Sequence, residues 1–254
     1  MIIKNSVLLL KSQNSNDDID KYEQILKSNK LDVKQVKTLV FNFKNLNSLK
    51  VKLENCINYS GIIFSSPRCV QAVHLASENS LFEKWRDKTN FSVGEETCAT
   101  ALKKLNLVCD GKESGNALCL SKVILQNKTQ YTKPFLFPHG NLKTDTLSLE
   151  LEKEGLSLDS VEVYDTIPNP KIEADLNVVT DNLTNISEFV VFFSPSGFTS
   201  TIGHIKRLPE DLNEVKFIAI GPVTETAIKE QNFNVYRIAT KPNPQCVLEA
   251  ILGT

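Results

Sequence analysis

The sequence predicts an α/β fold with two similar lobes, and three observations agree on it. First, GIIFSSPRCVQAVHLA (61–76) corresponds to FVVFFSPSGFTSTIGHI (189–205), since each apolar run stops at Ser-Pro and continues as a helix-compatible stretch. Second, FSVGEETCATALKKLNLV (91–108) corresponds in the same way to FIAIGPVTETAIKEQNFNV (217–235). Third, strands alternate with helices along the chain, which is typical of parallel sheets covered by helices. A repeat of this size indicates two lobes rather than a short-period solenoid.

The first elements follow from apolar runs and cap residues. SVLLLK (6–11) is expected as a buried strand, and the polar NSNDD stretch offers N-cap residues for a helix near 18–29. The partly alternating run 33–43 is longer than a typical strand, so we expect it to leave one lobe and enter the next. The elements expected after it are a helix at 46–57, a strand at 61–65 and a helix at 67–78.

Pro and Gly residues divide the middle of the chain. Gly94 separates a strand from a helix, Pro138 is expected to end a strand, and Gly155 suits the position just past a helix. The expected elements are a partly helical segment at 82–91, strands at 91–93, near Leu107 and at 133–138, helices at 96–104, 117–126 and 142–154, and a second long extended segment at 158–167. Beyond Pro168, Asn169 and Pro170 we expect strands at 189–193, 215–220 and 234–238 and helices at 196–207, 223–231 and 244–252.

The two long extended segments predict the domain organisation. Residues 1–35 and 168–254 are expected to form one discontinuous lobe and 44–157 the other, with 36–43 and 158–167 as connector strands. Two chain passages make a double hinge, which permits rigid-body opening and closing. Polar strand ends from both lobes are then expected to face one cleft, because open α/β sheets bind ligands outside the carboxyl ends of their strands.

Composition limits the function classes. The formal net charge of −1 argues against a nucleic-acid partner, and the six cysteines form no C-x-x-C pair that would indicate a zinc site. The apolar run near the N-terminus is too short for a signal peptide, and no stretch is long enough to span a membrane. We therefore expect a cytoplasmic protein with reduced thiols, and a monomer because no apolar surface stripe is left unassigned.

The common catalytic motifs are missing. The chain has no G-x-S-x-G, no P-loop and no G-x-G-x-x-G, and no cluster with metal-ligand spacing. Of the three histidines, His74 and His204 fall on the repeated helices and favour a structural role, while His139 at a strand end can approach the cleft. Hydroxyls remain at the strand-to-helix turns, on Ser65, Ser66, Thr97, Ser194, Ser196 and Thr224.

Two interpretations of these hydroxyls stay open. They can simply cap helices, and a duplicated fold would copy its caps. They can also bind a substrate with several carboxylates, because helix N-termini favour anions. Arg68 and Lys143 follow strand ends and either add positive charge to such a site or face solvent.

The ordered segments GIIFSSPRCV, FLFPHGNLK, VEVYDTIPNP, FFSPSG and AIGPVTETA resemble the uroporphyrinogen-III synthase family of tetrapyrrole and heme biosynthesis, eukaryotic members above all. The match runs from VLLLK to KPNPQCVLEAI, nearly the whole chain. The resemblance implies two flavodoxin-like lobes with parallel sheets, a two-stranded connector, a cleft between the lobes, and neither metal nor organic cofactor. It implies a cyclising hydro-lyase that closes hydroxymethylbilane, a linear tetrapyrrole rich in carboxylates, with inversion of the last pyrrole ring and loss of water.

Position by position, the resemblance also implies site residues. The substrate-binding residues that match the family's motifs are Ser65, Ser66, Arg68, Thr97, Gly140, Asn141, Lys143, Ser194, Ser196, Gly197 and Thr224. Tyr164, in the V-Y-x-T segment of the connector, is the candidate catalytic residue, with packing between the lobes as the alternative role. Two departures stand out: Val223 replaces a common Thr, and GEETCATAL is one residue longer than usual, so Thr100 competes with Thr97.

A rival interpretation is a two-lobed small-molecule binding or regulatory protein without catalysis. A periplasmic binding protein needs export, and a transcriptional regulator needs a DNA-binding segment. Neither feature is found in this sequence. An inactive relative kept for protein interactions is a third option.

Overall fold

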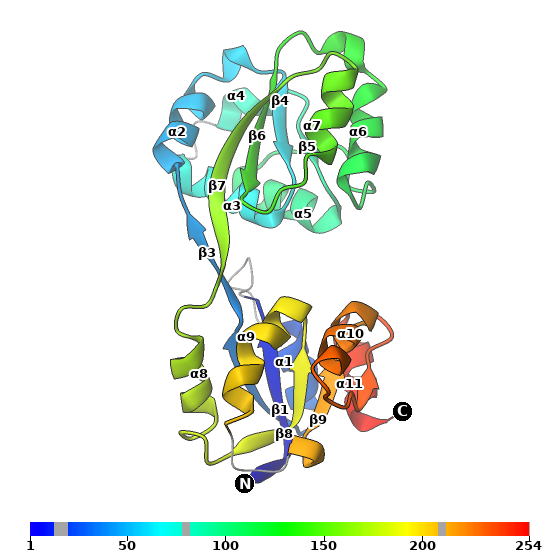
Figure 1. The fold of residues 1–254 in the computed structure, drawn as a ribbon. Coiled ribbons are helices and arrows are strands. Elements are labelled where there is room, and N and C mark those ends of the chain that lie inside the picture. Colours follow the sequence, from blue (N-terminus) through cyan, green and yellow to red (C-terminus); the bar gives the residue numbers. More distant parts are fainter. Residues whose placement is uncertain (13–19, 78–81, 208–211, 254) are drawn as a thin grey trace. The chain divides into compact units, whose positions relative to one another are not determined.

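The computed structural model describes residues 1–12, 20–77, 82–207 and 212–253. Its contacts divide the chain into two compact units, which we call unit 1 (Met1–Val40 and Ile167–Thr254) and unit 2 (Phe41–Thr166). Each unit is built on one five-stranded sheet, and the described residues form 11 α-helices in total (Figure 1). The predicted α/β class with mostly parallel sheets is confirmed. The division of the contacts falls within the predicted connector strands, at 40/41 and 166/167.

The sheet of unit 1 has the strand order β10-β9-β8-β1-β2, and its strands pair in parallel. Its strands are β1 (Ile2–Lys11), β2 (Asp32–Lys37), β8 (Ile186–Phe192), β9 (Lys216–Ala219) and β10 (Arg237–Ile238). Numbered within the unit, this order is 2-1-3-4-5, the order of flavodoxin-like sheets. The first crossover therefore turns one way from β1 and the next turns the other way, so the switch point lies between β1 and β8.

Helices cover both faces of this sheet, because side chains alternate along each strand. The helices are α1 (Lys21–Ser28), α8 (Ile172–Val179), α9 (Pro195–Ile205), α10 (Pro222–Glu230) and α11 (Pro244–Leu252). Leu8 and Leu10 of β1 pack with α8, α9 and α10, whereas Val7 and Leu9 pack with α1 and α11. The strands in the middle are thus buried on both sides, as the continuous apolar runs predict.

Unit 2 repeats this plan with the order β3-β7-β6-β4-β5. Its strands are β3 (Leu39–Phe43), β4 (Gly61–Phe64), β5 (Phe91–Ser92), β6 (Phe135–Gly140) and β7 (Leu158–Pro168). The pairs β4–β5, β4–β6 and β6–β7 are parallel. The switch point lies between β4 and β6, and β3 occupies the outer position beside β7.

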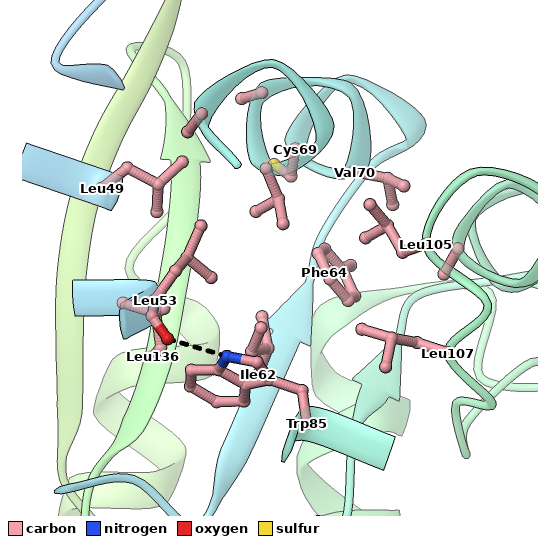
Figure 2. Packing of buried hydrophobic residues seen from close by; sticks show 14 of the residues in the cluster. Leu49, Leu53, Ile62, Phe64, Cys69, Val70, Trp85, Leu105, Leu107 and Leu136 are labelled. Atoms are coloured by element: carbon pink, nitrogen blue, oxygen red, sulfur yellow. Dashed lines mark hydrogen bonds between the residues drawn. The ribbon is translucent and has the colours of Figure 1, made fainter. Parts of the chain in front are cut away.

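The core of unit 2 is also split by its sheet. Its helices are α2 (Leu46–Glu54), α3 (Pro67–Ala76), α4 (Glu83–Arg86), α5 (Glu95–Leu105), α6 (Ala117–Leu125) and α7 (Thr146–Lys153). One face carries α2 to α5, and the other carries α6 and α7. Figure 2 shows the first cluster, where the fully buried Trp85 donates Nε1–H to the carbonyl oxygen of Leu53 at 3.0 Å. A Cβ on Gly61 would lie 1.9 Å from the carbonyl oxygen of Thr89, so the start of β4 requires glycine.

Several element predictions were wrong in detail. The run 33–43 passes from one sheet to the other, as expected, but as two strands, because the chain breaks at Thr38 and β2 and β3 join different sheets. The strand near Leu107 is only an isolated bridge between Phe91 and Asp110. Helix α8 was missed because Pro168, Asn169 and Pro170 suggested a loop. Asn169 Oδ1 accepts the N–H of Lys171, which is the N-cap residue of the helix.

Two further boundaries moved. Strand β6 continues through Pro138 to Gly140, because β4 pairs with β6 only at Phe135 and Leu136. Beyond those residues β6 has a ladder partner on the β7 side only, so the missing N–H of proline is tolerated. Helix α7 begins at Thr146 rather than at 142. The predicted first residues of the helix at 18–29, and its NSNDD cap, lie outside the described residues, and the described helix begins after Asp20.

Candidate functional site

The carboxyl ends of β4 and β6 lie next to each other in unit 2. They are neighbours in the sheet, yet the helices that follow them, α3 and α7, belong to opposite faces. This is the switch point, where open α/β sheets bind ligands. We call the group at this position the unit 2 edge, consisting of Phe41, Ser65, Ser66, Arg68, Gly140 and Tyr164.

Ser66 connects the first turn of α3 to Tyr164. It is the N-cap of the helix, in extended conformation, and its Oγ accepts the N–H of Cys69 at 3.4 Å. The same Oγ lies 3.3 Å from the hydroxyl of Tyr164. Ser66 therefore caps the helix and contacts Tyr164 at the same time, through one oxygen. Behind it, Ser65 Oγ lies 3.4 Å from the sulfur of Cys69, and burial raises the pKa of that thiol.

Tyr164 is held from several sides. Its ring makes edge contacts with Phe41 and Phe43, at centroid distances of 6.0 and 6.4 Å. A Cβ on Gly140, its register partner in β6, would lie 2.5 Å from Cζ of the ring, so the ring passes directly over a glycine. Burial, more than any other effect, raises the pKa of Tyr164, against the smaller opposing effects of Ser66 and Arg68. The hydroxyl therefore stays protonated at neutral pH and can donate a hydrogen bond.

Arg68 brings positive charge to the same edge. Its guanidinium carbon lies 3.5 Å from the centre of the Phe41 ring. Burial lowers the pKa of Arg68, and the hydroxyl of Tyr164 and the carboxylate of Glu96 oppose that effect. An arginine remains charged at neutral pH in proteins. A charged guanidinium beside a helix N-terminus suits a carboxylate ligand.

Asn141 and Lys143, which follow β6, have local partners. Asn141 Oδ1 accepts the N–H of Thr166 at 2.9 Å, and its Nδ2 donates to the carbonyl oxygen of the same residue at 3.4 Å. This side chain extends the β6–β7 ladder. Lys143 Nζ lies 3.5 Å from a carboxylate oxygen of Asp145. The structure thus brings Ser66, Arg68, Gly140 and Tyr164 together, while Asn141 and Lys143 lie beyond the end of the strand.

The threonines of α5 are buried rather than presented to solvent. Thr97 is 3% exposed, and Thr100 donates its hydroxyl to the carbonyl oxygen of Glu96 at 2.7 Å. Gly94, with a φ of +78°, occupies the N-cap position of the helix. A backbone in this region favours glycine, and Gly94 leaves the first amides of α5 without a side-chain cap. The assignment of Thr97 to substrate binding stays a prediction.

In unit 1 the turn after β8 matches the turn after β4. Ser194 caps α9 by accepting the N–H of Gly197 at 3.0 Å, and Ser196 Oγ lies 3.1 Å from Ser194 Oγ. A Cβ on Gly197 would lie 3.1 Å from Ser194 Oγ, which makes glycine the best fit there. Thr224 is buried in the first turn of α10, and Val223 beside it is exposed.

Sequence reasoning missed two residues, Phe41 inside β3 and Lys11 at the end of β1. Phe41 packs on both Arg68 and Tyr164, and the only signal in the sequence is its spacing of two from Phe43 in a strand. Lys11 ends β1, and its Nζ lies 2.5 Å from Asp20 Oδ2 and 4.9 Å from the centre of the Tyr22 ring. No sequence pattern indicates that Lys11 and Asp20, the N-cap of α1, form a mostly buried ion pair.

His139 and His204 are buried, in β6 and α9. His139 Nδ1 lies 2.9 Å from the carbonyl oxygen of Gly140, and His204 Nδ1 lies 2.8 Å from the Arg207 guanidinium. Burial lowers the pKa of each imidazole, and a nearby cation, Lys143 or Arg207, acts in the same direction. Both rings therefore favour the neutral form in the folded protein.

We expect the free energy of unfolding to decrease as the pH falls below about 6.5, the ordinary pKa of histidine. In this range the unfolded chain binds more protons than the folded one, so stability present above that pH is lost as the pH falls through the lowered pKa values. Urea midpoints measured between about pH 8 and about pH 5 test this. The double variant His139→Gln/His204→Gln should show a shallower pH dependence. An equally steep loss in that variant would assign the effect to other groups.

The described residues were also compared with the requirements for disulfides, metal sites and membrane-spanning helices. All six cysteines are free. Within the described ranges, no three or more His, Cys, Asp or Glu side chains are grouped so that they could hold a metal ion. No helix in this part of the chain is long and apolar enough to cross a membrane.

Comparisons with known proteins agree with one another. The family model described as "HEM4: Uroporphyrinogen-III synthase HemD" matches residues 38–249. A uroporphyrinogen-III synthase of Saccharomyces cerevisiae is 28% identical over 269 residues, which cover 96% of this chain and 94% of the yeast protein. The crystal structure of uroporphyrinogen-III synthetase from Helicobacter pylori has a TM-score of 0.65 at 16% identity and covers 98% of both chains. A mutant uroporphyrinogen III synthase from Thermus thermophilus has a TM-score of 0.55 at 12% identity, covering 98% of this chain and 99% of its own. At these identities the two structures show the likeness of fold.

Proposed function

Because this chain belongs to the uroporphyrinogen-III synthase family of cyclising lyases, we propose that it converts hydroxymethylbilane to uroporphyrinogen III. The linear tetrapyrrole loses water, its last pyrrole ring is inverted, and the macrocycle closes. The observation that carries the proposal is the unit 2 edge. A charged guanidinium, the capped N-terminus of α3 and a protonated phenol belong to one switch point there.

Each residue has a distinct role in this proposal. Arg68 binds a substrate carboxylate, helped by the N-terminal amides of α3. Tyr164 donates its proton toward the substrate hydroxyl as that group leaves as water. In unit 1, Ser194, Ser196 and Gly197 at the start of α9, and Thr224 in α10, bind further carboxylates mainly through main-chain N–H groups. Thr97, Asn141 and Lys143 remain proposed binding residues on the strength of the motif match.

We also propose a domain organisation for the enzyme. One domain consists of residues 1–35 and 168–254, the other of residues 44–157, and residues 36–43 and 158–167 form connector strands between them. It also includes the cytoplasm as the compartment and a monomer as the active form. Six free cysteines favour a reducing compartment. A binding or regulatory protein without catalysis is not favoured, because the family match covers 38–249.

The test supplies hydroxymethylbilane to purified protein in the presence of a chelator. Without enzyme, the linear compound closes spontaneously to the type I isomer, so the protein must direct the geometry as well as the rate. We expect mainly the type III isomer by chromatography of the oxidised products, with heat-denatured protein as the control. An isomer distribution equal to that of the control would refute the proposed function.

A further inference from the structure

Phe41 lies in β3 at the first position of unit 2, and its ring contacts two groups of the site at once. The Arg68 guanidinium carbon is 3.5 Å from its centroid, which places the cation over the face of the ring. The ring of Tyr164 meets it edge-on, with an interplanar angle of 79°. Phe43 follows two positions later, on the same face of the strand, and contacts Tyr164 but has no described contact with Arg68.

A ring under a guanidinium restricts the cation without occupying its donors. The N–H groups of arginine lie in the guanidinium plane, whereas the aromatic ring takes one face of that plane. A long arginine side chain also has considerable rotamer entropy, and ordering it before the substrate arrives lowers the cost of binding. The half-buried position of Arg68 strengthens the attraction, because cation–π contacts gain when they are desolvated.

We propose that Phe41 is a positioning residue for the proposed reaction, orienting Arg68 so that its N–H edge meets a substrate carboxylate. The inference rests on the proposed function, since it takes Arg68 as a carboxylate-binding residue. The orientation of Tyr164 depends less on Phe41, because Phe43 and Gly140 also enclose that ring. The loss of Phe41 should therefore affect substrate binding more than turnover.

The experiment compares Phe41→Leu with Phe43→Leu, which removes an equivalent ring from the same strand face. We expect Phe41→Leu to raise KM about tenfold, which corresponds to about 1.4 kcal/mol, while kcat stays within about threefold. Phe43→Leu should leave KM within about twofold of wild type. Phe41→Tyr keeps a ring face and should restore KM. Equal KM values for the two Leu variants, or a Phe41→Tyr variant as impaired as Phe41→Leu, would overturn the inference.

A second readout does not depend on activity. In ¹⁵N-labelled full-length protein, the Nε–H resonance of Arg68, assigned by its loss in Arg68→Lys, should show an upfield ring-current shift. The shift should persist in Phe43→Leu and Phe41→Tyr and disappear in Phe41→Leu. A resonance unaffected by Phe41→Leu would overturn the proposed contact even if KM changes. Failure of the wild-type isomer assay would refute the proposed function while this measurement still tests the placement of Arg68.

Discussion

Replacing Tyr164 with Phe should lower the turnover of hydroxymethylbilane at least about tenfold, or about 1.4 kcal/mol in barrier, with little change in thermal stability. The substrate hydroxyl needs a proton to leave as water, and positioned acids typically contribute about 10²- to 10⁴-fold. Burial raises the pKa of Tyr164, so the donor form persists across neutral and moderately alkaline pH. The ring contacts with Phe41 and Phe43 are retained in the variant, which is why stability should hold.

Suitable controls separate the donor role from packing. Tyr236→Phe removes a phenolic hydroxyl from unit 1, where the side chain is 42% exposed, and should leave turnover unchanged. Ser66→Ala should cost less than Tyr164→Phe, because main-chain amides still bind carboxylates at α3. If Tyr164→Phe turns over like wild type while Tyr164→Ala unfolds the protein, Tyr164 has a packing role only.

Gly140→Ala should produce a comparable loss of turnover, at least about tenfold, through the position of the same ring. The new Cβ would lie 2.5 Å from Cζ and 2.8 Å from the hydroxyl oxygen of Tyr164, distances that van der Waals contact does not permit. The ring must swing away, and its hydroxyl then leaves Ser66. We expect a moderate decrease in melting temperature as well, because overpacking of a close contact typically costs about 1–3 kcal/mol.

Gly203→Ala is the matched control, since it makes the same substitution in helix α9. A Cβ there meets nothing within 4 Å, and alanine is the better helix former, so stability should be equal or slightly higher. The double variant Gly140→Ala/Tyr164→Phe should lose no more activity than the worse single variant, because both changes remove one donor. Additive losses in the double variant would contradict a shared mechanism.

The sequence predicted the helix-cap residues at the strand ends correctly, but it did not predict how the chain runs through 33–43. Ser66 and Ser194 were identified as turn residues because a Ser before Pro at the end of an apolar run is a local pattern, and both cap helices as expected. The course of 33–43 could not be predicted to this level. Its alternation is compatible with one strand, and only the pairing of β2 with β1 and the place of β3 beside β7 require a break at Thr38.

The contacts of Gly140 and Asn141 also could not be predicted from the sequence. The motif match predicts a binding role for Gly140, which stays a prediction, and in the structure the absent side chain makes room for Tyr164, 24 positions later in the chain. The same match predicts that Asn141 binds substrate, which stays a prediction, and the structure adds that its side-chain oxygen accepts the N–H of Thr166. Register between β6 and β7 decides both contacts, and register depends on which faces of the whole sheet become buried.

By itself the sequence determined the α/β class, the duplicated strand–turn–helix pattern, the helix caps and the family, because each is written in local spacing of apolar, Pro and Ser residues. Only the tertiary structure decided which strand ends became neighbours: β4 beside β6, and β3 carrying Phe41 beside β7 carrying Tyr164. The reason is that strand order and register are fixed by burying both faces of a sheet at once. Burial of both faces depends on residues far apart in the chain, so no local sequence pattern predicts strand order or register.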